Sequence, residues 1–135
     1  VLFAFHRFGS KLSEPVDNMS RGGLFAYIDV ETGICGKAKQ LHHYDQVFSC
    51  HPDTGARIEG LQVPNWAELM DYLKKSHTAF PFYEFFAWDV LISKDGKPYI
   101  IEINRGSDLS IQSLHPMRND KLGKYMKEHK LLDRR

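Results

Sequence analysis

Apolar and polar residues alternate most clearly between residues 88 and 105, which read WDVLISKDGKPYIIEINR. Two apolar runs, Trp88–Ser93 and Tyr99–Ile103, flank the segment Lys94–Lys97, which has Asp-Gly at its centre. Asp-Gly between alternating apolar residues is the strongest short-range signal for a β-hairpin. The pattern therefore predicts two antiparallel strands joined by a tight turn.

The predicted turn determines which residues face each other across the hairpin. With Asp95 and Gly96 as the two central turn residues, the pairs are Lys94 with Lys97, Ser93 with Pro98, Leu91 with Ile100, and Asp89 with Glu102. Because side chains alternate between the two faces of a strand, Asp89, Glu102 and Asn104 are predicted to share one face.

This shared face has the composition of a metal site. Two carboxylates directly opposite each other on a sheet repel, so a fold that keeps Asp89 opposite Glu102 usually supplies a cation or a shared proton. Asn104 adds an amide oxygen, and such an oxygen-rich set suits Mg²⁺, which completes its shell with waters and substrate phosphates. The alternative is that these are unrelated solvent-facing charges at the open end of a hairpin, since surface carboxylates are common.

The rest of the pattern predicts an α+β fold, an antiparallel β-sheet built from hairpins with two covering helices. The predicted elements are a strand at Val1–Phe8, a loop at Gly9–Arg21, a hairpin with strands at Leu24–Val30 and Ile34–Leu41, a loop at Leu41–Ile58, a helix at Trp66–Lys75, an aromatic connector at Phe80–Phe86 and a helix at Lys121–Leu131. Asn65 is the predicted N-cap of the first helix.

Composition limits the class of protein. A chain of 135 residues with 42% hydrophobic and 26% charged residues fits one domain, residues 1–135, and contains no run long enough to span a bilayer. Eighteen basic and 17 acidic residues give a net charge of +1, which does not favour nucleic acid as a partner. The two cysteines, Cys35 and Cys50, fit free thiols in a reducing compartment and hence a cytoplasmic location.

Three histidines raise the question of a zinc site. His42, His43 and His51 match no structural zinc spacing, and no cysteine pair supports them, so we interpret them as loop or interface residues. The amino terminus is apolar from Val1 and lacks a methionine and the basic region of a signal peptide. We therefore expect a piece of a longer polypeptide.

Two further segments are candidates for anion binding. Arg7 ends an aromatic strand, where its planar guanidinium suits phosphate, although such an arginine is more often ion-paired at the surface. The segment Ser20–Gly23 contains Gly22 and Gly23, which let backbone amides approach a phosphate, although they also serve strand geometry.

In order along the chain, these motifs resemble the carboxy-terminal part of an ATP-grasp domain, most closely the sugar-transfer-associated ATP-grasp proteins of bacterial surface-polysaccharide gene clusters. The motifs are Arg7, Asn18 with Arg21-Gly22-Gly23, Ile28–Gly33, His51-Pro52, Gly60, Pro64-Asn65-Trp66, Trp88-Asp89, Asp95-Gly96 and Glu102-Ile103-Asn104. An acidic residue on one strand followed by Glu-x-Asn on the next resembles the family's metal-binding signature.

The resemblance implies roles for particular residues. Asp89, Glu102 and Asn104 would hold Mg²⁺ or Mn²⁺ for ATP, and a substrate carboxylate would attack the γ-phosphate to give an acylphosphate that an amine captures. Arg7 and Arg105 would contact phosphate or another anionic group during catalysis. Asn18, Arg21, Gly22 and Gly23 would line the side of the site that binds a small carboxylate or sugar-linked substrate.

The resemblance also implies that part of the site lies elsewhere. The amino-terminal lobe of such domains supplies the phosphate-binding lysines, a glycine-rich flap and the adenine hinge, which this chain lacks, so a missing lobe or a second copy is an expected partner. Alone, the chain is expected to bind nucleotide weakly. Two alternatives remain open, a non-catalytic binding or scaffold module of the same pathway and a small metal-dependent phosphohydrolase.

Overall fold

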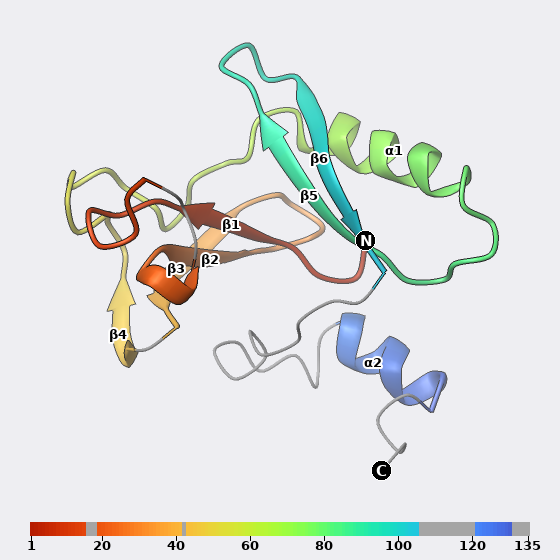
Figure 1. The fold of residues 1–135 in the computed structure, drawn as a ribbon, viewed down its shortest axis with the longest axis horizontal. Helices are drawn as coiled ribbons and strands as arrows, with labels where there is room; N and C mark the ends of the chain where they lie inside the picture. Colours follow the sequence, from red (N-terminus) through yellow and green to blue (C-terminus); the bar gives the residue numbers. More distant parts are fainter. Residues whose placement is uncertain (16–18, 42, 106–120, 131–135) are drawn as a thin grey trace. The chain divides into compact units, whose positions relative to one another are not determined.

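The computed structural model describes residues 1–15, 19–41, 43–105 and 121–130. The chain divides into two compact units, one formed by Val1 with Val63–Leu109 and the other by Leu2–Gln62 with Ser110–Arg135. The described residues form antiparallel strands in two sheets and two α-helices, which is an α+β arrangement (Figure 1). The sequence pattern predicted a single sheet, whereas the strands of the described residues form one sheet of four strands and one of two.

The Leu2–Gln62 unit is built on a four-stranded antiparallel sheet whose strands follow chain order. Its elements are β1 Phe5–Phe8, the 3₁₀ turn η1 Met19–Arg21, β2 Leu24–Ile28, β3 Cys35–Gln40, β4 His43–Phe48 and the helix α2 Lys121–Glu128. β2 pairs with both β1 and β3, and four of its five residues are buried. The apolar residues of β2 therefore form the centre of this unit's core.

Three predicted strands are shorter than expected, and one of them, β3, begins at Cys35 instead of Ile34 and ends at Gln40 instead of Leu41. β1 begins at Phe5 instead of Val1, and β2 ends at Ile28 instead of Val30. β2 ends there because the Asp29 carboxylate accepts the backbone N–H groups of Glu31 and Thr32, at 2.9 and 3.0 Å, and so stabilises a turn. These two hydrogen bonds, first the one from Thr32 and then the one from Glu31, lower the pKa of Asp29.

β4 is a strand that the sequence pattern did not predict. The sequence pattern predicts a loop over residues 41–58, whereas His43–Phe48 pairs with β3 at the end of the sheet. Within the described residues β4 pairs with β3 alone, and Asp45, Gln46 and Val47 are exposed. An edge strand exposed in this way needs no apolar alternation, so its sequence carries little strand signal.

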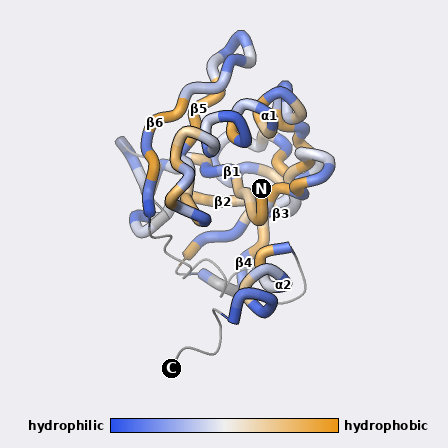
Figure 2. The backbone as a smooth tube through the Cα atoms, turned by 90° about the vertical axis from the view of Figure 1, so that its right-hand side faces the viewer, coloured by the Kyte–Doolittle hydropathy of each residue, from blue (hydrophilic) through white to orange (hydrophobic). Residues whose placement is uncertain are grey.

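The Val63–Leu109 unit combines the helix α1, Trp66–His77, with the hairpin of β5, Ala87–Ile92, and β6, Pro98–Asn104. Trp66, Leu69 and Leu73 form the buried stripe of α1, at the spacing that the sequence predicted. The strand β6 contains both apolar and polar residues, which the colouring by hydropathy distinguishes (Figure 2).

Asn65 is the N-cap of α1, as the sequence predicted, but its side chain does not cap the helix. Asn65 has φ 52° and ψ 36°, in the left-handed region, and its side chain makes no capping hydrogen bond. Its amide nitrogen instead donates to the carbonyl oxygen of Gly96, at 3.1 Å. Asn65 therefore connects the start of α1 to the turn of the hairpin.

Candidate functional site

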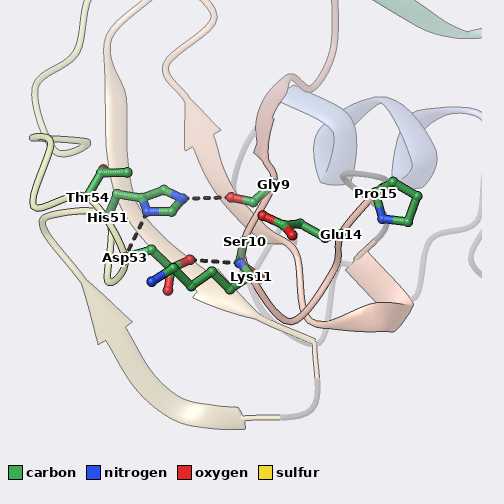
Figure 3. Close-up of a pocket in the computed structure, with 8 residues that line it drawn as sticks. All are labelled: Gly9, Ser10, Lys11, Glu14, Pro15, His51, Asp53 and Thr54. Carbon is green, nitrogen blue, oxygen red and sulfur yellow. Dashed lines mark hydrogen bonds between the residues drawn. The ribbon is translucent and has the colours of Figure 1, made fainter.

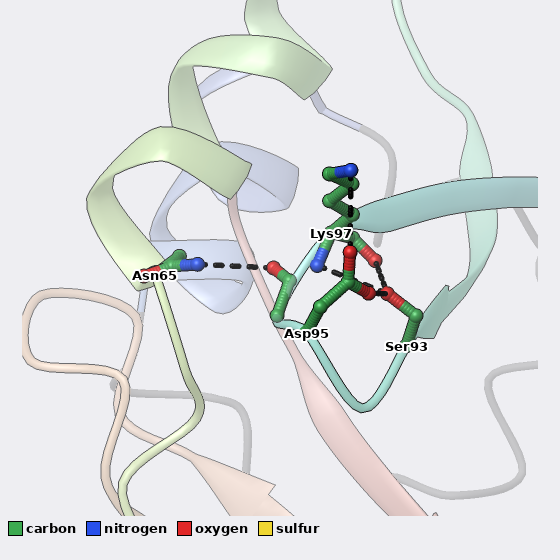
Figure 4. Close-up of polar contacts among 5 residues, drawn as sticks. Asn65, Ser93, Asp95 and Lys97 are labelled. Atoms are coloured by element: carbon green, nitrogen blue, oxygen red, sulfur yellow. Dashed lines mark hydrogen bonds and ion pairs between the residues drawn. The ribbon is translucent and has the colours of Figure 1, made fainter.

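The β5–β6 hairpin turns through a three-residue loop, Lys94–Gly96, instead of the predicted two-residue turn (Figure 4). The N–H of Ser93 donates to the carbonyl oxygen of Lys97 at 2.9 Å, and Gly96 adopts φ 80°, which favours glycine. The predicted pairs nearest the turn are therefore wrong by one residue. The observed pairs are Ser93 with Lys97, Ile92 with Pro98, Leu91 with Tyr99 and Val90 with Ile100.

Side chains reinforce this loop. The Ser93 hydroxyl donates to the Asp95 carboxylate, whose other oxygen lies 3.2 Å from the Lys97 ammonium nitrogen. The hydrogen bond from Ser93, followed by that from Lys97, lowers the pKa of Asp95. The loop is therefore defined by its own side chains as well as by its backbone.

A bulge in β6 restores the predicted pairing farther from the turn. Val90 pairs with Ile100, but the next residue of β5, Asp89, pairs with Glu102, so Ile101 is an extra residue without a partner in β5. The longer loop and the bulge shift the register by one residue in opposite senses. Asp89 and Glu102 therefore lie directly opposite each other, as the sequence predicted.

The two faces of the hairpin differ in what covers them. Trp88 is on the face toward α1, because its ring centroid lies 6.4 Å from that of His77. Alternation places Asp89, Glu102 and Asn104 on the opposite face, with Asn104 paired to Ala87. Leu91 and Tyr99 continue this opposite face toward the turn and are 55% and 52% exposed, which defines it as the open face of the hairpin.

The donor set on the open face fits a hard divalent cation. It offers two carboxylates and an amide oxygen; Glu102 is exposed, and Asp89 and Asn104 are half-buried. Mg²⁺ prefers such oxygens and takes its remaining ligands from water or phosphate. Among the residues that the structure describes, no group of three or more His, Cys, Asp or Glu side chains is arranged to hold a metal. The candidate set is not such a group, because only Asp89 and Glu102 are carboxylates and the third donor is the amide of Asn104.

Arg105 follows the metal candidates directly in sequence. Its Nη1 donates to the hydroxyl oxygen of Tyr83 at 3.2 Å, and its guanidinium carbon lies 5.7 Å from the centroid of that ring. Arg105 belongs to the same compact unit as the three metal candidates, Asp89, Glu102 and Asn104.

The other candidates belong to the unit built on the four-stranded sheet. Arg7 lies on β1 opposite Phe25 and has an exposed side chain, and Arg21 is the exposed last residue of η1. Gly22 and Gly23 connect η1 to β2. Asn18 lies outside the described residues.

The glycine segment is held by two buried polar side chains that the sequence pattern did not indicate. The carbonyl oxygen of Gly22 accepts a hydrogen bond from the Ser10 hydroxyl and another from the Gln40 amide, each at 2.8 Å. Gly22 has φ 96°, and a Cβ there would lie 3.0 Å from the Cβ of Leu12. The segment therefore needs glycine at this position for both backbone and steric reasons.

A pocket of about 470 Å³ lies between the loop that follows β1 and the turn that follows β4 (Figure 3). Nε2 of His51 lies 2.7 Å from the carbonyl oxygen of Gly9, and Asp53 accepts the backbone N–H of Lys11 at 2.9 Å. Nδ1 of His51 accepts the N–H of Asp53, so Nε2 carries the proton that is donated to Gly9. His51 thus joins two loops, in agreement with its interpretation as a loop residue.

Comparison with known proteins identifies the class. A family model matches residues 1–119, a span that includes every candidate site residue, and makes the chain a member of the ATP-grasp class. The chain belongs to the sugar-transfer associated ATP-grasp family, as its motifs had suggested. This membership supports binding of ATP. No curated protein and no solved structure matches the chain. Within the part of the chain that the structure describes, none of the helices has the length and apolar character needed to cross a membrane.

Proposed function

We propose that this chain is the ATP- and Mg²⁺-binding half of an ATP-dependent carboxylate-amine ligase-like enzyme, and the carboxy-terminal half of an ATP-grasp domain. The observation that carries the proposal is the pairing of Asp89 with Glu102, with Asn104 on the same face, in a chain of the ATP-grasp family. A cytoplasmic role in surface-polysaccharide biosynthesis is the context we infer from the family's sugar-transfer description.

In this proposal the open face of the hairpin holds the metal through Asp89, Glu102 and Asn104. When bound, Mg²⁺ or Mn²⁺ neutralises charge on the phosphate oxygens and orients them for transfer. Attraction of both carboxylates to the cation would offset their mutual repulsion.

The same face suits the rest of a nucleotide. Leu91 and Tyr99 are paired, exposed and apolar, and they lie on the turn side of Asp89 and Glu102. A ligand with a phosphate end and an aromatic base matches a face that changes from carboxylates to apolar side chains along the strands. This match supports a nucleotide more than a free metal ion or a purely polar ligand.

Further roles are proposed for residues of each compact unit taken by itself, on the basis of the family membership. Arg105 would bind a phosphate group beside the metal, and Arg7 would stabilise the phosphate or acylphosphate. In the unit built on the four-stranded sheet, Arg21, Gly22 and Gly23, with Asn18, would bind a small carboxylate or sugar-linked substrate. The amino-terminal lobe or a second copy of the chain would supply the remaining contacts to the nucleotide.

Thermal unfolding with and without Mg²⁺ or Mn²⁺ tests this function. A ligand at ten times its Kd stabilises a protein by about 1.4 kcal/mol, which for a chain of this size raises Tm by about 4 °C. We expect Asp89→Asn and Glu102→Gln to abolish the metal-dependent rise. The matched control is Asp71→Asn on α1, whose carboxylate is exposed and makes an exposed ion pair with Lys74 at 3.5 Å.

Two outcomes would count against the proposal. No metal-dependent rise in the wild-type protein would remove its metal-binding basis. A rise that persists in Asp89→Asn and Glu102→Gln would place the cation elsewhere and favour a binding or scaffold module that keeps the fold without this chemistry.

A further inference from the structure

Arg105 is held in place by a residue far from it in sequence. Its Nη1 donates to the Tyr83 hydroxyl at 3.2 Å, while the guanidinium carbon is 5.7 Å from the ring centroid. A separation of 5.7 Å is near the outer limit of about 6 Å for a cation–π interaction. The hydroxyl therefore orients the guanidinium more strongly than the ring does.

Tyr83 itself is fixed by the aromatic connector before β5. Its ring centroid lies 5.3 Å from that of Phe86, which in turn lies 5.7 Å from Trp88 on β5 and 5.3 Å from His77 on α1. The connector was singled out in the sequence only as an aromatic segment. Through these ring contacts, Tyr83 packs by way of Phe86 on α1 and on the side of β5 that faces α1.

The position of this pair matters because of what lies beside it. Asn104 pairs with Ala87 in the last pair of the hairpin, and Arg105 comes directly after it. Asp89 and Glu102 form the pair that lies two residues nearer the turn. Arg105 thus follows the end of the hairpin at which the candidate metal residues lie, and its contact with Tyr83 connects it to the covered side of the hairpin.

We propose that Tyr83 is a positioning residue that holds the Arg105 guanidinium for binding a phosphate group of the nucleotide. This inference rests on the proposed function. An exposed arginine loses much rotamer freedom when it binds a ligand, and a partner that restricts it beforehand lowers that entropy loss. The tyrosine hydroxyl accepts one of the five guanidinium N–H donors and leaves the others for the phosphate oxygens.

Isothermal titration of the full chain with Mg-ATP tests the proposal. Tyr83→Phe removes the hydroxyl and keeps the ring that packs on Phe86, so the fold is retained. We expect Tyr83→Phe to weaken Mg-ATP binding by about threefold to tenfold, which corresponds to the net contribution of one ordinary hydrogen bond. Phe82→Leu is the matched control, since Phe82 belongs to the same connector and is 92% exposed.

A double-mutant cycle with Arg105→Ala shows whether Tyr83 acts through the arginine. We expect Tyr83→Phe to have no further effect on Mg-ATP affinity once Arg105 is alanine. An equal loss of affinity in both backgrounds would overturn the proposal, because Tyr83 would then contribute by some other route. Unchanged affinity in the single variant would overturn it as well.

A second readout separates this inference from the proposed function. Relaxation of the Arg105 Nε resonance, assigned through its loss in Arg105→Lys, reports side-chain order without any ligand. We expect Arg105 to be ordered in the wild-type protein and in Phe82→Leu, and to become mobile in Tyr83→Phe. Equal order in wild type and Tyr83→Phe would overturn the positioning role, whereas ordered Arg105 without any Mg-ATP binding would overturn only the proposed function.

Discussion

Asp89 and Glu102 lie directly opposite each other on the open face of the β5–β6 hairpin, and two features of the hairpin together produce that pairing. The Lys94–Gly96 loop moves the register by one residue, and the bulge at Ile101 moves it back. Like charges in such a pair destabilise a sheet. A cation bound between the two carboxylates would offset such an unfavourable interaction.

The first prediction concerns this repulsion in the absence of metal. Glu102→Gln in chelator-treated buffer should raise the free energy of unfolding by about 0.2–1 kcal/mol, because it removes one of two opposed charges. Chemical denaturation at low ionic strength measures the change, and added salt should reduce it. A destabilised Glu102→Gln protein under these conditions would contradict a repulsive pair.

The second prediction concerns the contact between α1 and the hairpin turn. Gly96→Ala should destabilise the protein by about 1–3 kcal/mol, because Gly96 has φ 80° and the new Cβ would lie 2.6 Å from the Asn65 amide nitrogen. Asn65→Ala removes that clash along with the hydrogen bond to the Gly96 carbonyl oxygen. The cost of Gly96→Ala measured by denaturation should therefore be smaller in the Asn65→Ala background; an unchanged cost would place the strain in the backbone alone.

The third prediction concerns the glycine segment. Gly22 and Gly55 both have positive φ, at 96° and 72°, but a Cβ at Gly22 would lie 3.0 Å from the Cβ of Leu12, whereas none of the described atoms lies within 4 Å of a Cβ at Gly55. Gly55→Ala should cost about 1 kcal/mol for backbone strain. Gly22→Ala should cost more, since Leu12 must also move. Equal losses of stability in the two variants would show that Leu12 yields freely.

The sequence predicted the parts of the fold that depend on local pattern. The buried stripe of α1 and the pairing of Asp89 with Glu102 are confirmed, because apolar spacing and strand alternation are written in the sequence. The predicted pairing assumed a two-residue turn and no bulge. Both assumptions are wrong, but the two shifts of register that they omit cancel each other. The bulge at Ile101 was not predicted, because the two adjacent isoleucines, Ile100 and Ile101, fit a regular strand as well as a bulged one.

Contacts between distant segments could not be predicted. Asn65 is a residue type that favours N-caps, but its side-chain amide donates to the carbonyl oxygen of Gly96, 31 residues away. Ser10 and Gln40 converge on the Gly22 carbonyl oxygen only because the sheet brings them together. Tyr83 and Arg105 are 22 residues apart and meet at one end of the hairpin. Each of these contacts depends on tertiary structure, which a local pattern does not contain.

The fourth prediction concerns the dependence of stability on pH. The hydrogen bonds from Thr32 and Glu31 lower the pKa of Asp29 in the folded state below its ordinary value of 3.8. The stability that the ionised carboxylate contributes should be fully present above pH 3.8 and be lost as the pH falls through the folded-state pKa. Asp29→Asn keeps an oxygen that can accept the same N–H groups, so the difference in unfolding free energy between wild type and variant should shrink in acid. A difference that stays constant down to pH 2 would contradict the lowered pKa.

The most direct test of the central claim is a titration of the full chain with Mn²⁺, followed by electron paramagnetic resonance of the free ion. The account predicts saturable binding in the wild-type protein and in the control Asp71→Asn, and a loss of affinity of at least about tenfold in Asp89→Asn and in Glu102→Gln. Circular dichroism of each variant would verify that it is folded. Mn²⁺ binding of wild-type strength in both Asp89→Asn and Glu102→Gln, or no saturable binding in the wild-type protein, would contradict a metal site on the open face of the hairpin.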